Sequence, residues 1–440
     1  MITYRKLKTL ALLIPALLAS LSISAQVTET IDITVHGSDG KTRQEVFDLP
    51  EGMTQPLDSL LSDWRSKTYL TTGTDCNLTD VNPVFSDSVY IDRLQKMSAI
   101  MEMPYNDIVR EFIDRYTVKY RKQVSYLLSA GNFYMPIFEE ALDAYNLPME
   151  LKYLPIIESS LNPKAVSRAG AVGLWQFMLR TAKLYGLEST NYVDDRRDPI
   201  KSTWAAAAYL KDMYDIYHDW NLVIAAYNAG PGNVNKAIKR AGGKTDYWEI
   251  YNYLPRETRS YVPIFIAATY VMNYYCKHNI CPLEATLPEA TDTIQISKDL
   301  HFDQIASVLN LDEDMLVSLN PQYKRNVIPG ETKTQTLRLP ESCIGSFIEQ
   351  QDSIYAYQRD KYFNGRKTVA VSQTTTAKKT TSTKAKAGSG TPVTHKIARG
   401  ETLGAIAQKY HVTVAQIRSW NGISGNRITA GKTLKIYNQK

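Results

Sequence analysis

One segment near the C-terminal end constrains the architecture most, because it cannot form a packed domain. Residues 364–392 carry six basic residues and no acidic residue. From Thr374 to Gly390 the side chains are those of Thr, Lys, Ala, Ser and Gly, none of which can build a core. Such a stretch buries too little apolar surface to offset its conformational entropy, so we expect a flexible basic linker.

A weak internal repeat flanks this linker at a constant spacing of 101 residues. The first copy spans Thr293–Pro340 and the second spans Val393–Tyr437, and each has the pattern strand–helix–helix–strand. Internal repetition predicts two small βααβ modules of one type. The matched pairs are Phe302 and Leu403, Ile305 and Ile406, Ala306 and Ala407, Leu316 and Ile417, Asn320 and Asn421, and Gly330 and Gly431.

A long helical region precedes both copies. From Leu147 to about Lys277 the helical periodicity is dense, and only Pro and Gly turns interrupt it. Gly186 is placed to end one helix, Asp198 to begin the next, and Gly230 to separate two more. The predicted fold class is α+β multidomain, with an all-α domain followed by small βααβ modules. The predicted boundaries are 1–25 for an export signal, 26–88 for an N-terminal segment of unknown role, 89–285 for the helical domain, 291–341 for the first module, 364–392 for the linker and 393–440 for the second module.

The first 25 residues have the pattern of a secretory signal peptide. Basic residues precede an apolar stretch from Leu10 to Leu21, and Ala25 offers a cleavage point. The alternative of an uncleaved N-terminal anchor stays open. No other apolar run approaches the length of a membrane span, so we expect no transmembrane segment in the mature chain.

Cysteine, histidine and charge patterns narrow the functions further. Four cysteines allow three pairings, and oxidation of Cys276 with Cys281 is one option in an exported chain. No Cys or His spacing resembles a zinc site, so no metal is expected. The formal net charge is +6, but residues 26–363 alone carry −10. An acidic body argues against a nucleic-acid-binding core.

Glu158 is the residue that most strongly suggests chemistry. On a helix, the three leucines of the segment 151–161 lie within about 60° of it, which places the carboxyl on the apolar face. Burial raises the pKa of a carboxyl, and a protonated carboxyl near neutral pH is what a general acid needs. The alternative is a core glutamate held by a structural partner such as Arg168. Pro155 predicts a kink in this helix.

Two clusters downstream combine aromatic and amide side chains, which suit sugar binding. Ser167–Met178 contains a Gly-rich turn with Trp175 and Gln176. The second cluster places Tyr227 and Asn228 at a predicted helix end. The structural alternatives are an ordinary core position for Trp175 and a C-cap for Asn228.

Several short motifs together resemble a known enzyme family. Glu158-Ser159, Gly173–Gln176 and Ala226–Asn228, in this order, are similar to the signature of family 1 lytic transglycosylases, the lysozyme-like enzymes of the SLT type. Asp195–Pro199 and Leu254–Thr258 resemble stretches of the membrane-bound lytic murein transglycosylase D subgroup. The C-terminal copy of the repeat resembles a LysM module, and the first copy resembles a divergent relative of it.

The resemblance implies a lysozyme-like fold and a peptidoglycan lytic transglycosylase that uses no cofactor or metal. Glu158 is then the single general acid and base. It protonates the oxygen between MurNAc and GlcNAc, takes a proton from the C6 hydroxyl of the same MurNAc, and leaves a 1,6-anhydro end. The implied substrate-binding residues are Ser159, Ser167, Gln176, Met178, Tyr227, Asn228 and Tyr261, and those of the LysM module are Gly400, Thr402, Leu403 and Asn421.

Two alternatives stay open at this point. A hydrolytic muramidase of the two-carboxylate kind needs a second acid flanking the bond, for which Asp194, Asp195 and Asp198 are candidates unless they cap helices. A non-catalytic wall-binding scaffold is the other alternative. The expected partner is peptidoglycan glycan and not nucleic acid, and the expected location is the cell envelope or periplasm.

Overall fold

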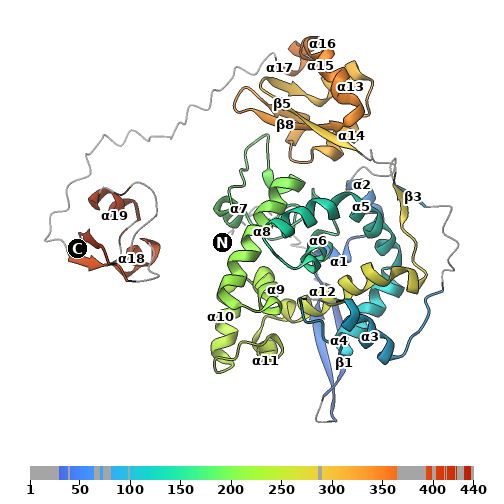
Figure 1. Ribbon diagram of the computed structural model, residues 1–440, viewed down its shortest axis with the longest axis vertical. Coiled ribbons are helices and arrows are strands. Elements are labelled where there is room, and N and C mark those ends of the chain that lie inside the picture. Colours follow the sequence, from blue (N-terminus) through green and yellow to red (C-terminus); the bar gives the residue numbers. More distant parts are fainter. Residues whose placement is uncertain are drawn as a thin grey trace, which may run out of the picture. The chain divides into compact units, whose positions relative to one another are not determined.

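The protein forms two compact units, Met1–Asn364 and Gly365–Lys440 (Figure 1). The predicted export signal, residues 1–25, and the predicted linker, residues 364–392, lie outside the described residues. The computed structural model describes residues 29–37, 40–63, 70–72, 81–97, 100–285, 290–363, 393–398, 403–410, 412, 414–421, 423 and 431–437.

A helical body makes up most of the first unit and surrounds one hydrophobic core (Figure 1). A π-helical turn at Arg115–Lys119 joins two of its helices, and a 3-10 turn at Met149–Tyr153 precedes another. The helices are α3 (Asp87–Met97), α4 (Asp107–Asp114), α5 (Arg121–Ala144), α6 (Leu154–Ser159), α7 (Leu179–Leu184), α8 (Pro199–Tyr217), α9 (Trp220–Ala229), α10 (Pro231–Arg240), α11 (Tyr247–Ile250) and α12 (Arg256–Tyr274).

Helix α12 lies at the centre of this body. Every residue from Tyr261 to Val271 is buried, and the helix packs against α4, α6 and α9. Such an all-round apolar helix is stable only inside a domain. It therefore brings α4, α6 and α9, which are far apart in the sequence, against one helix.

The N-terminal segment, whose role was open from the sequence, belongs to the same core. Strands β1 (Thr30–His36) and β2 (Thr42–Asp48) pair antiparallel and lead into α1 (Glu51–Thr54) and α2 (Leu57–Asp63). Gly52 lies so close to α6 that an added Cβ would approach the carbonyl oxygen of Ile157 to 2.6 Å. Strand β3 (Leu70–Thr72) pairs with β4 (Leu283–Ala285). This pairing joins the chain just before the first long helix to the chain just after the last one.

Short-range signals in the sequence set the helix boundaries around the site. The Asp198 carboxylate accepts hydrogen bonds from the first turn of α8, which begins at Pro199 as predicted. Helix α7 ends before Gly186, and Gly230 separates α9 from α10, both as predicted. The predicted kink at Pro155 is wrong, because this proline lies in the first turn of α6, where its missing N–H is tolerated.

The second copy adopts the predicted strand–helix–helix–strand order, and the first adopts it with one additional short strand on each side of its two helices. In each, the same asparagine joins the second helix to the last strand. Asn320 Oδ1 accepts from Arg338 N, and Asn421 Oδ1 accepts from Lys435 N. The first copy consists of β5 (Thr291–Ile296), β6 (Asp299–His301), α13 (Phe302–Leu309), α14 (Glu313–Leu319), β7 (Val327–Pro329) and β8 (Gln335–Pro340); the second consists of β9 (Val393–Lys396), α18 (Leu403–Lys409), α19 (Val414–Asn421) and β10 (Thr433–Ile436).

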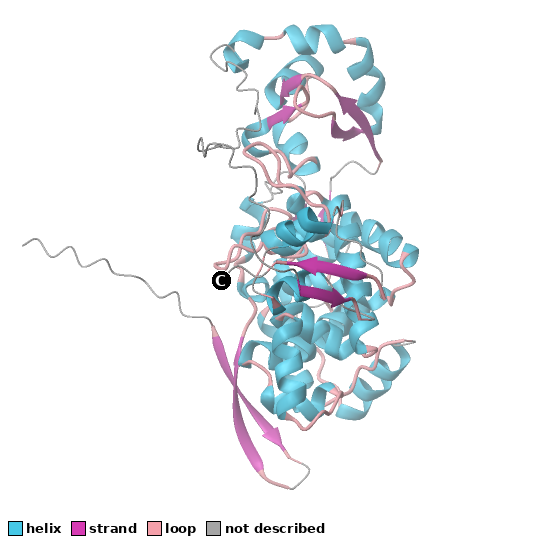
Figure 2. Cartoon of the chain, turned by 90° about the vertical axis from the view of Figure 1, so that its left-hand side faces the viewer, coloured by secondary structure: helices cyan, strands magenta, loops and turns pink. Residues whose placement is uncertain are grey.

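The first copy is larger than the repeat alone. Three further helices, α15 (Ile344–Glu349), α16 (Gln351–Ala356) and α17 (Arg359–Phe363), follow it, and Phe347 and Ile354 are fully buried in its core. The sheets seen in the described parts of the chain are two-stranded antiparallel pairs among helices (Figure 2). The predicted α+β multidomain class is confirmed.

Two further expectations concern cysteines and membranes. Cys276 and Cys343 are free thiols, and Cys281 is disulfide-bonded, so the pair Cys276–Cys281 is not formed. Within the described ranges, no helix combines the length and the apolar character needed to cross a bilayer.

Candidate active site

Glu158 lies in the last turn of the short helix α6, on its apolar side as predicted. Ile157 and Leu161 beside it are fully buried, while the Glu158 side chain keeps a small exposed part. Burial raises the pKa of this carboxyl to about 8. The helix ends abruptly after it, because Ser160 and Leu161 both adopt left-handed backbone conformations with φ of +50° and +58°. Such strained residues are frequent at functional sites.

The structural partner suggested for Glu158 is not present. Arg168 instead forms an ion pair with Glu51, with Nε 2.7 Å from Oε1. The group that contacts Glu158 is Tyr261 of α12, whose hydroxyl donates a hydrogen bond to Oε1 of Glu158. Tyr261 is almost completely buried, and this burial together with the nearby Glu158 charge raises the pKa of the phenol well above its ordinary value. The phenol therefore stays a hydrogen-bond donor at all ordinary pH values.

The Gly-rich turn before α7 packs against α6. Gly173 has a φ of +89°, and an added Cβ would lie 1.8 Å from the carbonyl oxygen of Arg196, so only glycine fits there. Gln176 Nε2 donates to the carbonyl oxygen of Gly173 at 2.8 Å, which closes the turn. Trp175 is fully buried and donates to Thr203 Oγ1 at 2.9 Å. The interpretation of Trp175 as a core residue is therefore the correct one.

Tyr227 of α9 connects this turn to the region of Glu158. Its hydroxyl donates to the carbonyl oxygen of Trp175 at 2.7 Å. Burial and the charge of Glu158 raise the pKa of Tyr227 well above its ordinary value, so it too is a neutral phenol. The structure thus brings Glu158, Tyr227 and Tyr261 together from three helices.

Asn228 is held by side chains of α12. Its Oδ1 accepts from Thr258 Oγ1 at 2.8 Å, and its Nδ2 donates to Glu257 Oε1 at 3.3 Å. Gly230 and not Asn228 is the C-cap of α9, so the capping alternative is wrong. Glu257 is an exposed carboxylate whose charge acts on Glu158 and adds to the rise in its pKa. Glu257 belongs to the family-like stretch Leu254–Thr258, but the motif alone indicates no role for its carboxylate.

One of the predicted substrate contacts, Ser159, is structural instead. Ser159 is completely buried, and its hydroxyl donates to the carbonyl oxygens of Pro155 and Leu174 at 3.0 and 2.9 Å. Its side chain joins α6 to the Gly-rich turn and cannot touch a substrate. Ser167 Oγ accepts from Ala171 N at 3.0 Å within the same turn, but its side chain is partly exposed, so a contact with substrate stays a prediction.

Met178 remains available to a ligand, because 46% of its surface is exposed at the start of α7. In the second module, Gly400 and Thr402 lie outside the described residues. Leu403 is buried in the module core, and the Asn421 side chain is used to join α19 to β10.

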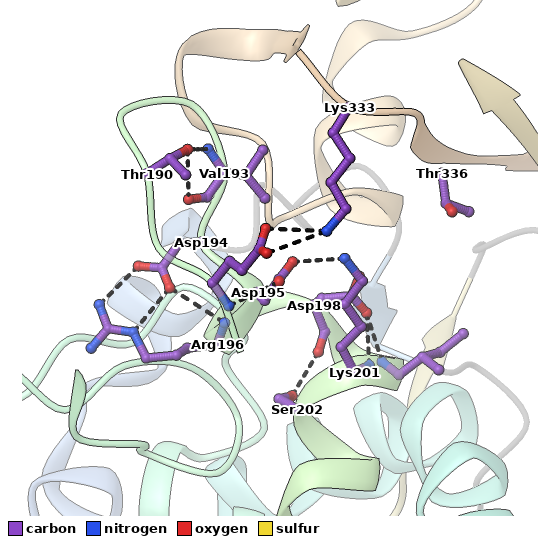
Figure 3. A network of polar contacts seen from close by, with 12 residues as sticks. Thr190, Val193, Asp194, Asp195, Arg196, Asp198, Lys201, Ser202, Lys333 and Thr336 are labelled. Atoms are coloured by element: carbon purple, nitrogen blue, oxygen red, sulfur yellow. Dashed lines mark hydrogen bonds and ion pairs between the residues drawn. The ribbon is translucent and has the colours of Figure 1, made fainter. Parts of the chain in front are cut away.

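The three aspartates considered as a second catalytic acid are structural. Asp194 is paired with Arg196, Asp195 with Lys201, and Asp198 caps α8 (Figure 3). They lie between the helical body and the first module, where Asp194 is 3% exposed. Asp194 and Asp198 thus act as the helix caps that were the alternative to a catalytic role.

Comparison with known families supports this arrangement. Residues 135–250 match the transglycosylase SLT domain, which includes Glu158, the Gly-rich turn and Tyr227. Residues 290–356 match the LysM-like domain of lytic transglycosylase MltD, and residues 395–436 match the LysM domain. The chain carries an SLT domain followed by two LysM-type domains. The resemblance inferred from the motifs is confirmed.

Several proteins similar to this chain are named lytic transglycosylases. The chain is 29% identical over 346 residues to membrane-bound lytic murein transglycosylase D of Escherichia coli strain K12, an alignment that covers 76% of this chain and 70% of that protein. Over 130 residues it is 36% identical to membrane-bound lytic murein transglycosylase F of Maricaulis maris, which covers 26% of each. The solved 70 kDa soluble lytic transglycosylase of Escherichia coli is 28% identical over 32% of this chain and 24% of that chain, with a TM-score of 0.29.

Proposed function

We propose that this SLT-type enzyme cleaves peptidoglycan glycan strands between MurNAc and GlcNAc without consuming water, leaving 1,6-anhydro-MurNAc ends. The observation that carries the proposal is the Glu158 carboxyl, whose pKa burial raises to about 8. A carboxyl with this pKa is mostly protonated at neutral pH, as a general acid must be. Relatives named lytic murein transglycosylases support peptidoglycan as the substrate class.

Glu158 acts twice in the proposed reaction. Its proton passes to the glycosidic oxygen as the bond from that oxygen to C1 of MurNAc breaks, and GlcNAc leaves with a free 4-hydroxyl. The Glu158 carboxylate then takes the proton of the C6 hydroxyl while O6 bonds to C1. The proton is back on Glu158 at the end, so the cycle requires neither water nor a second carboxylate.

The neighbours of Glu158 support this double role. Tyr261 donates to Oε1, which holds the carboxyl in one orientation and leaves Oε2 to exchange protons with the sugar. Because Tyr261 and Tyr227 have strongly raised pKa values, they are neutral and do not compete as acids or bases. By resemblance, Gln176 lines the cleft and Asn228 helps to position the sugar, and Met178 supplies an exposed apolar surface.

Hydrolysis of the same bond is the second candidate, and Glu257 is the observation that favours it. A two-carboxylate glycosidase needs a second acid near the first. Glu257 is close enough for its charge to raise the pKa of Glu158, and Asn228 holds it in place. Under this alternative Glu257 activates a water molecule.

The C-terminal LysM domain is proposed to hold the enzyme on the wall. By resemblance, its backbone near Gly400–Leu403 and the loop after Asn421 bind the glycan. Residues 393–440 carry a net charge of +7, which suits an anionic polymer. Tethering multiplies a weak affinity through effective concentration. From this role and the export signal predicted at residues 1–25, we propose that the enzyme acts in the periplasm.

Mass spectrometry of the fragments released from purified peptidoglycan tests the proposal. Wild type is expected to release fragments lighter by one water than hydrolytic muropeptides. Glu158→Gln is expected to release none, while Glu257→Gln keeps the anhydro product at a reduced rate. Glu140→Gln, the same change at an exposed position of α5, is the matched control. Reducing-end products that disappear in Glu257→Gln establish hydrolysis instead, and wall binding without any cleavage by wild type leaves a scaffold.

A further inference from the structure

The loop between α7 and α8 is shared with the LysM-like module. Val193 of this loop forms an isolated β-bridge with Tyr323. Backbone hydrogen bonds lie on either side of the bridge, from Asp194 N to the carbonyl oxygen of Gln322 at 2.9 Å and from Lys324 N to that of Tyr192 at 2.7 Å. The Val193 side chain, 6% exposed, is part of the hydrophobic core of the module. This loop is therefore docked as if it were an edge strand of the module.

A buried ion pair follows directly after the bridge (Figure 3). Arg196 binds the Asp194 carboxylate through both Nε and Nη2, each at 2.9 Å. Burial by itself raises the pKa of Asp194, but hydrogen bonds and charge from Arg196 hold it below its ordinary value. Lys324 of the module adds a third charge 3.7 Å from Asp194, and it also donates to the carbonyl oxygen of Thr190 at 2.8 Å.

Arg196 then continues the connection to the Gly-rich turn of the active site. Its Nη1 donates to the carbonyl oxygens of Gly170 and Phe177 at 3.2 and 3.3 Å, which lie at the two ends of that turn. Its own carbonyl oxygen packs against Gly173. From the turn, the carbonyl of Leu174 accepts from Ser159, the residue next to Glu158.

We propose that the LysM-like module is a fixed part of the catalytic body and positions the active-site turn through Asp194 and Arg196. The two are positioning residues, since Asp194 holds Arg196 and the Arg196 guanidinium contacts the turn and not the Glu158 carboxyl. The module fixes the loop through the β-bridge, Asp194 of the loop fixes the Arg196 side chain, and Arg196 binds both ends of the turn that carries Gln176. This inference rests on the proposed function for its activity readout.

The interface offers a matched pair of lysines for the test. Lys324 contacts the Asp194 network, whereas Lys333 of the same module pairs with Glu188 where both side chains are more than half exposed. Exposed ion pairs contribute little to stability, so the Lys333–Glu188 pair serves as the control. In the full chain, Lys324→Met and Asp194→Asn are compared with Lys333→Met and with the charge-preserving Lys324→Arg.

Two readouts separate positioning from other roles. Amide hydrogen exchange over residues 170–177 is expected to accelerate about tenfold in Asp194→Asn and severalfold in Lys324→Met, and to stay unchanged in Lys333→Met. The kcat on soluble glycan fragments is expected to fall most in Asp194→Asn, less in Lys324→Met and not at all in Lys333→Met, while KM stays within twofold of wild type. Lys324→Arg is expected to keep the wild-type kcat. Exchange and kcat that stay at the wild-type level in both Asp194→Asn and Lys324→Met overturn the inference, as does a change in KM alone, which indicates a sugar contact. If wild type cleaves nothing, the proposed function fails, and the exchange measurement still decides the coupling.

Discussion

Replacing the acid Glu158 by glutamine is expected to abolish cleavage and at the same time to stabilise the folded protein at neutral pH. The reason is the carboxyl's pKa, which burial raises from an ordinary value of 4.5 to about 8 in the folded state. The folded protein therefore holds this proton more strongly than the unfolded chain. Linkage requires stability to be greatest below pH 4.5 and to fall as the pH rises toward 8.

The size of this effect follows from the shift. Each pKa unit corresponds to about 1.4 kcal/mol of folding stability. Relative to low pH, the protein therefore loses about 5 kcal/mol of stability above pH 8 and about 3 kcal/mol at pH 7. Part of the Glu158 side chain is exposed, and solvent screening reduces the loss at pH 7 to about 2 kcal/mol. Glutamine at this position carries no charge and keeps an oxygen to accept from Tyr261. At roughly 2–4 °C per kcal/mol, the variant should unfold about 5 °C above wild type at pH 7.

Thermal unfolding followed by far-UV circular dichroism checks this expectation between pH 4 and pH 8. The difference in midpoint between Glu158→Gln and wild type should be near zero at pH 4 and should grow steadily with pH. Glu140→Gln, the exposed control on α5, should show no such growth. A midpoint difference that does not depend on pH, or a variant less stable than wild type at pH 8, would refute the reasoning that burial raises the pKa of Glu158.

Three further outcomes are expected. Tyr261→Phe removes a hydrogen bond that lowers the pKa of Glu158. The alkaline limb of the pH–rate profile should therefore move to higher pH, and kcat should fall about tenfold. A limb that does not move would contradict the effect of this hydrogen bond on the pKa of Glu158. Gly52→Ala should lower the free energy of unfolding by about 2 kcal/mol or more, because the new Cβ meets the α6 backbone, whereas Gly345→Ala in open space should be neutral in the same denaturant titration. Deleting residues 393–440 should abolish most pelleting with insoluble wall while cleavage of soluble fragments continues; retained pelleting argues against the LysM role.

Some features of the site were predictable because they depend on short stretches of chain. The placement of Glu158 on an apolar face follows from residues within two helical turns of it. The start of α8 follows from Asp198 capping it and from the proline after it, and the order of elements in both modules follows from a repeat spacing. In each case neighbours in sequence are also neighbours in space, so periodicity and capping rules apply directly.

Other features depend on pairs of residues far apart in the chain. Ser159 was predicted to bind substrate from its motif, but its side chain direction is set by the turn it packs against, and it points inward. Glu257 gave no signal by itself, because its proximity to Glu158 results from the way α12 crosses α6 and α9. The alternative role of Glu158 as a core residue named Arg168 as a possible partner, but the N-terminal segment provides Glu51 for Arg168 instead.

The sequence by itself determined the helical nature of the main domain, the duplicated modules, the family resemblance and the candidate acid. All of these depend on local periodicity and on short motifs. Only the tertiary structure decided that the N-terminal segment supports α6, that Tyr261 orients the Glu158 carboxyl, and that the Asp194 loop belongs to two domains at once. The physical reason is that burial and the hydrogen-bond partner of each polar group are decided when distant segments pack together. A pattern within one segment specifies which face is apolar, but not what covers it.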